Sequence, residues 1–240
     1  MKLDYLIVIP ARYKSSRFEG KPLADINGKS MIERVWEKCS ETSPKKNIIV
    51  ATDDKRIFQH CRSKEINVLM TSKKCLTGSD RVAEVAKKIE AKFYVNVQGD
   101  EPLINPKDIL KVIKDFKKNK ITNCAATTIK DKDELYNLNI PKIASAENGL
   151  VLYISRANIP SNKESIPKKL KKQVCIYCFS KEALNLFGIN SKKTYLEKTE
   201  DIELLRVLEN GIPIRVIDVE SDSMAVDTPE DLKRVRKICK

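Results

Sequence analysis

The stretch that decides the fold reads YLIVIPARYKSSRFEGKPL and occupies residues 5–23. Its apolar start is typical of a strand buried on both faces of a parallel sheet. A loop with small polar residues and several cations follows, among them Arg12, Arg17 and Lys21. Because open α/β sheets bind ligands at the carboxyl ends of their parallel strands, we expect this loop to hold a polyphosphate. The alternative interpretation is a solvated basic loop after an edge strand.

Length and composition are those of a globular domain. The chain has 240 residues, 41% of them hydrophobic, enough for a substantial core. It shows no repeat, low-complexity segment or clear linker, so we predict a single domain over residues 1–240. The start carries charged Lys2 and Asp4, unlike a signal peptide, and no apolar run reaches the roughly 18 residues that a membrane span needs. We therefore expect a protein that does not associate with a membrane.

The net charge of +13 comes from 46 Lys and Arg residues against 33 Asp and Glu residues. The cations are spread along the chain, and the densest run, residues 168–172, has no adjacent aromatic side chain for base stacking. The charge therefore favours a lysine-rich surface and small anionic substrates, with no nucleic-acid partner. A non-enzymatic module that binds nucleotides or RNA remains the minor alternative.

The seven cysteines are odd in number and irregular in spacing. Cys175 and Cys178 form a C-x-x-C pair, but they lie in an apolar alternating stretch without a second half-motif, and His60 is the single histidine. Structural zinc sites need four such ligands. We expect reduced, mostly buried thiols, which are typical of a cytoplasmic protein.

Strand-length apolar runs alternate with helical patterns in the first half. Strands are predicted at 5–9, 47–52, 67–70 and 93–97, and helices at 30–38, 57–62 and 81–90. This alternation predicts βαβ units and hence a mostly parallel sheet flanked by helices, an α/β fold.

The second half is less regular, and we predict an irregular insertion there. Strands are expected at 124–129, 150–154, 175–179 and 212–217, and helices at 181–187 and 197–209. Prolines interrupt residues 137–170, and residues 158–172 are predicted to form a mobile, charged loop that could close over a substrate. The last helix is predicted to begin with Thr228 as N-cap, Pro229 in the first turn and Asp231 as capping acid.

Polar residues at the ends of these elements carry the candidate chemistry. Gln98 and Asp100 follow the strand at 93–97, where an amide can bind a base edge and a carboxylate can hold Mg²⁺ beside phosphates. Asp227, before the last helix, is either a second metal ligand or a helix N-terminal acid. Arg81 stands in a Gly-Ser turn into a helix, a pattern that gives an anion site or an ordinary helix start.

Arg156 follows the strand at 150–154 and is a candidate to bind an acidic acceptor, as is Lys142; a plain surface charge is the alternative for both. No nucleophile–base pair stands out. In-line nucleotidyl transfer needs none, since it needs cations, a metal and a positioned acceptor oxygen.

Seven motifs, in order along nearly the whole chain, resemble the 3-deoxy-manno-octulosonate (Kdo) cytidylyltransferases, or CMP-Kdo synthetases. They are IPARYxSxR (9–17), GKPL (20–23), IVATD (49–53), GSDR (78–81), VNVQGDEP (95–102), SRAxIP (155–160) and VDTPEDL (226–232). The resemblance implies a Rossmann-like nucleotidyltransferase fold. It also implies that CMP is transferred from CTP to an acidic sugar with release of pyrophosphate, for bacterial lipopolysaccharide or capsule synthesis, by a homodimer.

The resemblance also implies residue roles. Arg12, Lys21 and Asp100 would be catalytic, and Asp100 and Asp227 would bind Mg²⁺. The nucleotide would be held by Ala11, Arg12, Ser15, Lys21, Arg81 and Gln98. The sugar acid would be held by Lys142, Arg156, Gln173, Tyr177 and Glu203. An acceptor-binding and dimerisation region is expected at about 137–200.

Departures from the family pattern fall mostly on the sugar side. Gln173 and Cys175 stand where the family has a histidine and a glycine, Leu204 replaces a glutamine, and Ser161 replaces a tryptophan. In the opening loop Glu19 replaces a proline. The alternative hypothesis is therefore a different acceptor: 8-amino-Kdo, another ulosonic acid or a phosphonate.

Overall fold

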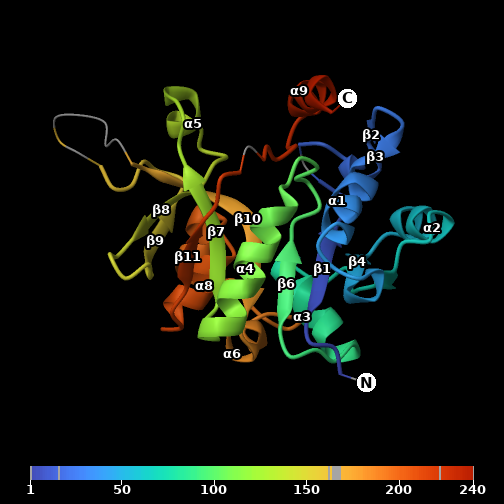
Figure 1. The fold of residues 1–240 in the computed structure, drawn as a ribbon, viewed down its shortest axis with the longest axis horizontal. Coiled ribbons are helices and arrows are strands. Elements are labelled where there is room, and N and C mark those ends of the chain that lie inside the picture. The colour runs from blue at the N-terminus through green and yellow to red at the C-terminus, as the bar shows by residue number, and fades with distance from the viewer. Residues whose placement is uncertain (1, 16, 162, 164–168, 222, 240) are drawn as a thin grey trace.

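We describe the protein from a computed structural model that covers residues 2–15, 17–161, 163, 169–221 and 223–239. In this part of the chain, nine strands form one sheet whose main path has the order β11-β7-β10-β6-β1-β4-β5 (Figure 1). The strands of that path are β1 (Leu6–Ala11), β4 (Ile48–Thr52), β5 (Val68–Met70), β6 (Tyr94–Val97), β7 (Asn123–Thr128), β10 (Lys171–Phe179) and β11 (Arg215–Asp218). β1 pairs in parallel with both β4 and β6, so the predicted βαβ order is confirmed.

Helices cover both faces of the sheet, and β1 shows why. Leu6 and Val8 point into one apolar core, while Ile7 and Ile9 point into the other. The first core is covered by α3 (Gly78–Lys88), α6 (Lys181–Asn185) and α8 (Leu204–Glu209). The second is covered by α1 (Met31–Ser40), α2 (Lys55–Ser63) and α4 (Pro106–Asn119). A strand buried on both faces must be apolar at every position, as this one is.

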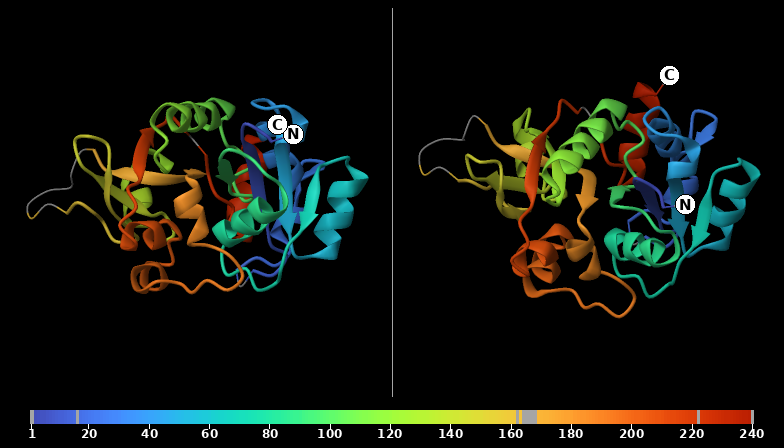
Figure 2. Two further views of the ribbon diagram at one scale, coloured as in Figure 1. Left: turned by 90° about the horizontal axis from the view of Figure 1, so that it is seen from below. Right: turned by 60° about the horizontal axis from the view of Figure 1, so that its bottom comes forward.

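The second half departs from parallel pairing. β10 is antiparallel to β6 and β7, and its other end pairs with β8 (Lys142–Ser145), which forms an antiparallel pair with β9 (Val151–Ser155). This hairpin and α5 (Lys132–Tyr136) project from the sheet and make up the predicted irregular insertion (Figures 1 and 2).

The C-terminal helix packs against a small hairpin that follows the opening loop. α9 (Pro229–Ile238) packs against the small hairpin β2 (Asp25–Ile26) and β3 (Lys29–Ser30), and both views show the C-terminus near this hairpin (Figures 1 and 2). The predicted capping of α9 is confirmed, because the Thr228 hydroxyl accepts from the Asp231 amide and the Asp231 carboxylate accepts from the Thr228 amide. This packing returns the segment before α9 to the end of β6.

Three sequence-based expectations are wrong. The single helix predicted at 197–209 is two helices, α7 (Tyr195–Glu200) and α8, because Asp201 adopts a left-handed conformation with φ of 51°. The predicted loop 158–172 already contains the start of β10 at Lys171; its residues 162 and 164–168 lie outside the described part of the chain. α4 is absent from the predicted elements. Among the described residues, no helix is long and apolar enough to span a membrane.

Candidate active site

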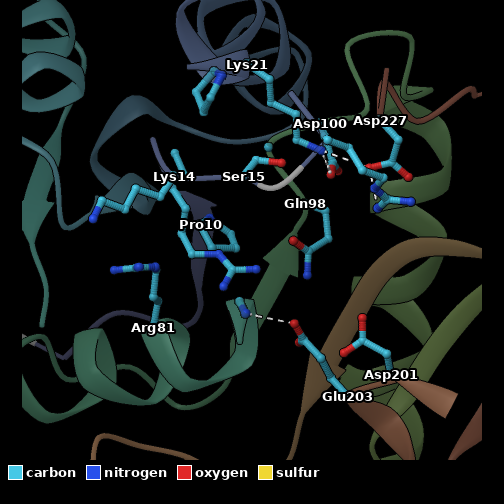
Figure 3. A pocket seen from close by; sticks show the side chains of 16 residues that line it. Pro10, Lys14, Ser15, Lys21, Arg81, Gln98, Asp100, Asp201, Glu203 and Asp227 are labelled. Carbon is cyan, nitrogen blue, oxygen red and sulfur yellow. Dashed lines mark hydrogen bonds and ion pairs between the residues drawn. The ribbon is translucent and has the colours of Figure 1, made fainter. Parts of the chain in front are cut away.

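A cavity of about 320 Å³ opens at the carboxyl ends of β1 and β6 (Figure 3). It contains every residue predicted for catalysis, nucleotide binding and metal binding. Its lining consists of Pro10, Ala11, Arg12, Lys14, Ser15, Arg17, Lys21, Pro22, Gly78, Arg81, Gln98, Gly99, Asp100, Asp201, Glu203 and Asp227. Because β1 and β6 are parallel neighbours, the loops after them meet at one edge, where α/β sheets bind ligands.

Lys21 lies at the centre of an ionic cluster on one side of the cavity. Its ammonium donates to Asp100 Oδ2 at 2.7 Å, to Asp227 Oδ1 at 3.1 Å and to the Val226 carbonyl at 3.0 Å. Burial opposes the charge of Lys21, but the two carboxylates outweigh it and raise its pKa above the ordinary value. Arg17 adds a second cation, with Nη2 3.0 Å from Asp227 Oδ1. The two carboxylates are therefore directed at one cation position.

The donor set of this cluster fits Mg²⁺. Carboxylate oxygens are the ligands that Mg²⁺ takes from proteins, usually one or two of them, with water and phosphate oxygens completing the octahedron. Asp100 and Asp227 supply two such groups from different loops, and the described residues contain no group of three or more His, Cys, Asp or Glu that could hold a metal ion. A metal here would depend on water and on a bound phosphate for its other ligands.

Arg81 lies on the opposite side of the cavity and is completely buried. Its Nη2 is 2.9 Å from Asp53 Oδ2, and its Nη1 donates to Thr71 Oγ1 at 2.7 Å. Its Nε has no hydrogen-bond partner among the described residues, although the side chain lines the cavity. An unpaired buried donor is costly, so a ligand that reached this nitrogen would supply a hydrogen bond that the described residues leave unmade.

Gln98 stands between the Lys21 cluster and Glu203 in Figure 3. Its backbone amide donates to the Cys175 carbonyl at 3.1 Å, while its side chain packs against Gly78. A Cβ added at Gly78 would lie 2.8 Å from Gln98 Nε2, so a larger residue at this position would displace the amide group. The glycine allows the Gln98 amide to lie against the first turn of α3 and face the cavity.

Glu203 holds the N-terminus of α3. Its carboxylate accepts from the backbone amides of Gly78 at 2.8 Å and Ser79 at 2.9 Å, and from the Ser79 hydroxyl. Burial raises the pKa of Glu203 above its ordinary value, although these hydrogen bonds oppose the shift. Glu203 lines the cavity as predicted for a substrate-binding residue, but its carboxylate already has protein partners.

A buried ionic network fixes α3 from the same side. Arg206 is 1% exposed and donates to Asp80 Oδ1 at 2.9 Å and to Glu197 Oε2 at 2.6 Å. Asp80 in turn accepts from Thr77, the N-cap of α3. The helix that carries Arg81 into the cavity is thus tied to α7 and α8, elements far along the chain.

The structure does not bring the remaining predicted sugar-acid residues into the cavity lining. The Arg156 guanidinium donates to the carbonyls of Glu200, Leu138 and Asp201, at 2.6, 2.9 and 3.0 Å. These bonds tie the end of β9 to the break between α7 and α8. The sequence could not show these contacts, because the partners are backbone groups of distant loops.

The other three residues predicted to hold the sugar acid also form hydrogen bonds within the protein. Lys142 is fully buried and donates to the carbonyls of Asn137 and Arg156, and burial lowers its pKa. Gln173 Nε2 donates to the Tyr177 hydroxyl at 2.6 Å, and Tyr177 is 5% exposed. All four side chains therefore have hydrogen-bond partners in the protein outside the cavity lining.

Two charged residues of the lining, Lys14 and Asp201, had no role in the sequence-based predictions. Lys14 belongs to the opening loop, and its position two residues after Arg12 in a basic loop could have identified it as a site residue. Asp201 enters the cavity because the chain turns there in the left-handed conformation. Asp tolerates that conformation better than most residues, but a continuous helical pattern around Asp201 concealed the turn.

Comparisons with known proteins agree with this geometry. The family model described as cytidylyltransferase matches residues 6–219. The chain is 40% identical to the mitochondrial 3-deoxy-manno-octulosonate cytidylyltransferase of Arabidopsis thaliana, covering 96% of this chain and 81% of that protein. It is also 40% identical to the 3-deoxy-manno-octulosonate cytidylyltransferase of Pseudomonas syringae pv. tomato, with 99% of each chain covered.

A solved structure of CMP:2-keto-3-deoxy-manno-octonic acid synthetase complexed with CTP superposes with a TM-score of 0.89 at 34% identity. The superposition covers 98% of this chain and 97% of that one. The predicted α/β nucleotidyltransferase fold is therefore confirmed, and the chain belongs to the cytidylyltransferase family as a nucleotidyltransferase enzyme.

Proposed function

We propose that the protein transfers CMP from CTP to 3-deoxy-manno-octulosonate or a related ulosonic acid, with release of pyrophosphate. The observation that carries the proposal is the single cavity lining that combines the Lys21–Asp100–Asp227 cluster with Arg12, Arg81 and Gln98. The 40% identity to named 3-deoxy-manno-octulosonate cytidylyltransferases over nearly the whole chain supports the same reaction.

The reaction needs charge neutralisation more than covalent chemistry. An acceptor hydroxyl oxygen attacks the α-phosphorus, the bond from that phosphorus to the bridging oxygen breaks, pyrophosphate leaves and the hydroxyl proton is released. Arg12 suits this step because its side chain is exposed and donates, at 3.2 Å, to the Leu76 carbonyl rather than to a carboxylate. Arg12 and Lys21 would stabilise the charge that develops on the phosphoryl oxygens.

The opposite part of the cavity suits the nucleoside. Cytosine presents both donors and acceptors along its base-pairing edge, and the Gln98 amide offers both. Arg81 Nε offers a further donor that has no partner among the described residues. We propose that these two side chains, with the Ala11 backbone and the Ser15 hydroxyl of the opening loop, hold the nucleotide.

Mg²⁺ would be held by Asp100 and Asp227, whose carboxylates converge on one cation position. When bound, the ion would neutralise phosphate oxygens and act as a Lewis acid on them. The residues of this chain would then orient the triphosphate through Arg12 and Lys21.

We assign the acceptor and the subunit contact to the region at about 137–200. Glu203 borders the cavity, and Lys142, Arg156, Gln173 and Tyr177 would shape the wall beside it. We further propose a cytoplasmic homodimer that serves lipopolysaccharide or capsule synthesis. The departures from the family pattern at Ser161, Gln173, Cys175 and Leu204 are the basis of the alternative acceptors: 8-amino-Kdo, another ulosonic acid or a phosphonate.

The test is pyrophosphate release with CTP, Mg²⁺ and a panel of Kdo, 8-amino-Kdo, a sialic acid and an aminoalkyl phosphonate. Release with Kdo is expected. Release with another member alone would keep the cytidylyl transfer and reassign the acceptor. No release with any member, from protein that binds CTP, would contradict the proposal.

A further inference from the structure

Lys21 occupies the position toward which both candidate metal ligands are directed. Its side chain is 14% exposed, against 26% for Asp100 and 23% for Asp227, so the three groups form a largely desolvated cluster. The ammonium has three N–H donors, and all three are taken: two by the carboxylates and one by the Val226 carbonyl. The Lys21 ammonium thus already balances the charge of the two aspartates.

We propose that Lys21 is a displaceable counter-ion, which keeps the Asp100–Asp227 pair closed to free divalent cations and leaves it when a metal–nucleotide binds. This inference rests on the proposed function and deepens it. It assigns to Lys21 an action on metal binding, in addition to its contact with phosphate.

A metal and the ammonium cannot share these oxygens. Mg²⁺ needs its ligands at about 2.0–2.1 Å in near-octahedral geometry, whereas the Lys21 nitrogen lies 2.7 and 3.1 Å from the same two oxygens. The two like charges would also repel each other strongly in a partly desolvated site. A metal therefore gains the carboxylates only if the ammonium moves away.

The backbone of Lys21 is fixed while its side chain can move. Lys21 begins a short 3-10 helix (Lys21–Leu23), after Gly20 in a left-handed conformation and before buried Pro22. Lysine has a flexible four-carbon side chain, so its ammonium group can move within the cavity without a backbone shift. A bound triphosphate would offer the released ammonium new anionic partners in the same cavity.

Arg17 also contacts one of the two carboxylates, but it would compete with a metal less strongly than Lys21 does. It contacts Asp227 alone, is 48% exposed, and also donates to Asn139 Oδ1 at 2.7 Å. An exposed ion pair is screened by water and contributes little. Lys21, which contacts both carboxylates from a buried position, is therefore the cation that decides whether a metal can bind.

The counter-ion also favours entry of the nucleotide. The cavity lining contains five cationic side chains and four carboxylates, so its net charge is positive while Lys21 is present. With Lys21 paired to Asp100 and Asp227, the carboxylates repel an incoming triphosphate less. Metal and nucleotide would thus bind together, rather than metal first.

The test measures Mn²⁺ binding to the nucleotide-free protein by the loss of the free-ion signal in electron paramagnetic resonance. Lys21→Met keeps most of the aliphatic stem and removes the charge, and we expect it to bind Mn²⁺ at least about tenfold more tightly than the original protein. Lys21→Gln should show the same gain, and provides the answer if the methionine variant does not fold.

Two controls separate this effect from a general loss of charge. Lys29→Met removes an exposed lysine that pairs with Glu37, and its Mn²⁺ affinity should stay unchanged. Lys21→Met combined with Asp227→Asn should lose the gain. Unchanged or weaker Mn²⁺ binding by both Lys21 variants would overturn the proposal. Because this assay contains neither CTP nor acceptor, its result is independent of whether the acceptor panel releases pyrophosphate.

Discussion

The guanidinium of Arg81 lies 2.9 Å from the carboxylate of Asp53, and the Arg81 side chain has no exposed surface. The two residues come from different elements, the first turn of α3 and the end of β4. The contact balances a buried charge and fixes an arginine that lines the cavity. The buried Arg81 charge is therefore balanced by the Asp53 carboxylate.

We expect Asp53→Asn to lower the free energy of unfolding by roughly 3 kcal/mol, because it leaves the Arg81 charge buried without its partner. The KM for CTP should also rise. Urea denaturation and initial-rate kinetics measure the two effects. Asp54→Asn is the matched control, since Asn caps a helix as well as Asp does and Arg56 is exposed; it should change stability by less than about 1 kcal/mol. Equal losses in both variants would refute the role of the Asp53–Arg81 pair.

Asp100→Asn should preserve the fold and reduce turnover by about a thousandfold or more. The variant removes one of the two carboxylates proposed for the metal, while Lys21 keeps its contacts with Asp227 and Val226. Circular dichroism and pyrophosphate release measure the two properties, with the exposed Asp133→Asn as control. Magnesium-dependent turnover above a tenth of the original would show that Asp100 does not bind an essential metal.

Gly78→Ala and Gly99→Ala test the packing around Gln98 in different ways. The new Cβ at residue 78 would lie 2.8 Å from a side-chain nitrogen of Gln98, so we expect a higher KM for CTP with little change in stability. At residue 99 it would lie 2.7 Å from the Pro10 backbone carbonyl, which cannot rotate away, so stability should fall as well. Thermal unfolding and CTP titration distinguish the two variants; a stability loss confined to Gly78→Ala would contradict this explanation.

Glu33 should make stability depend on pH in the acid range. Burial disfavours its charge, but hydrogen bonds from Ser30 and Lys64 outweigh this effect and lower its pKa to about 2 from 4.5. A lowered native pKa means that Glu33 stabilises the fold above about pH 4.5 and that this stabilisation is lost as pH falls towards 2.

Glu33→Gln should therefore cost about 2–3 kcal/mol at pH 7 and flatten the pH dependence between those values. Urea unfolding at several pH values checks it. Glu37→Gln, on the same helix, removes an exposed partner of Lys29 and should cost less than about 1 kcal/mol. An unchanged acid slope in Glu33→Gln would mean that Glu33 has no lowered pKa.

The sequence predicted the parts of the fold that depend on local pattern. β1 is apolar at each position because both of its faces are buried, and α9 begins where Thr228 and Asp231 indicate. The sequence also predicted that loops after strands would meet at one site. The loops after β1 and β6 do so, because parallel pairing brings them to one edge of the sheet.

The remaining features depend on contacts between distant segments. Lys21 and Asp227 are 206 positions apart, and the packing of α9 against the β2–β3 hairpin supports the segment that carries Asp227. Arg156 looked available for a ligand, but three backbone carbonyls from other loops bind it. The break at Asp201 likewise has no local signal beyond the residue type.

The central claim is that the cavity promotes attack on the α-phosphorus of CTP by a sugar acid. The most direct test is phosphorus-31 magnetic resonance of the protein with CTP, Mg²⁺ and Kdo, followed through the reaction. We predict a new phosphodiester signal from the CMP-sugar together with an equal amount of pyrophosphate. The appearance of CDP with a phosphorylated sugar would contradict it, because that result places the reaction at the γ-phosphorus.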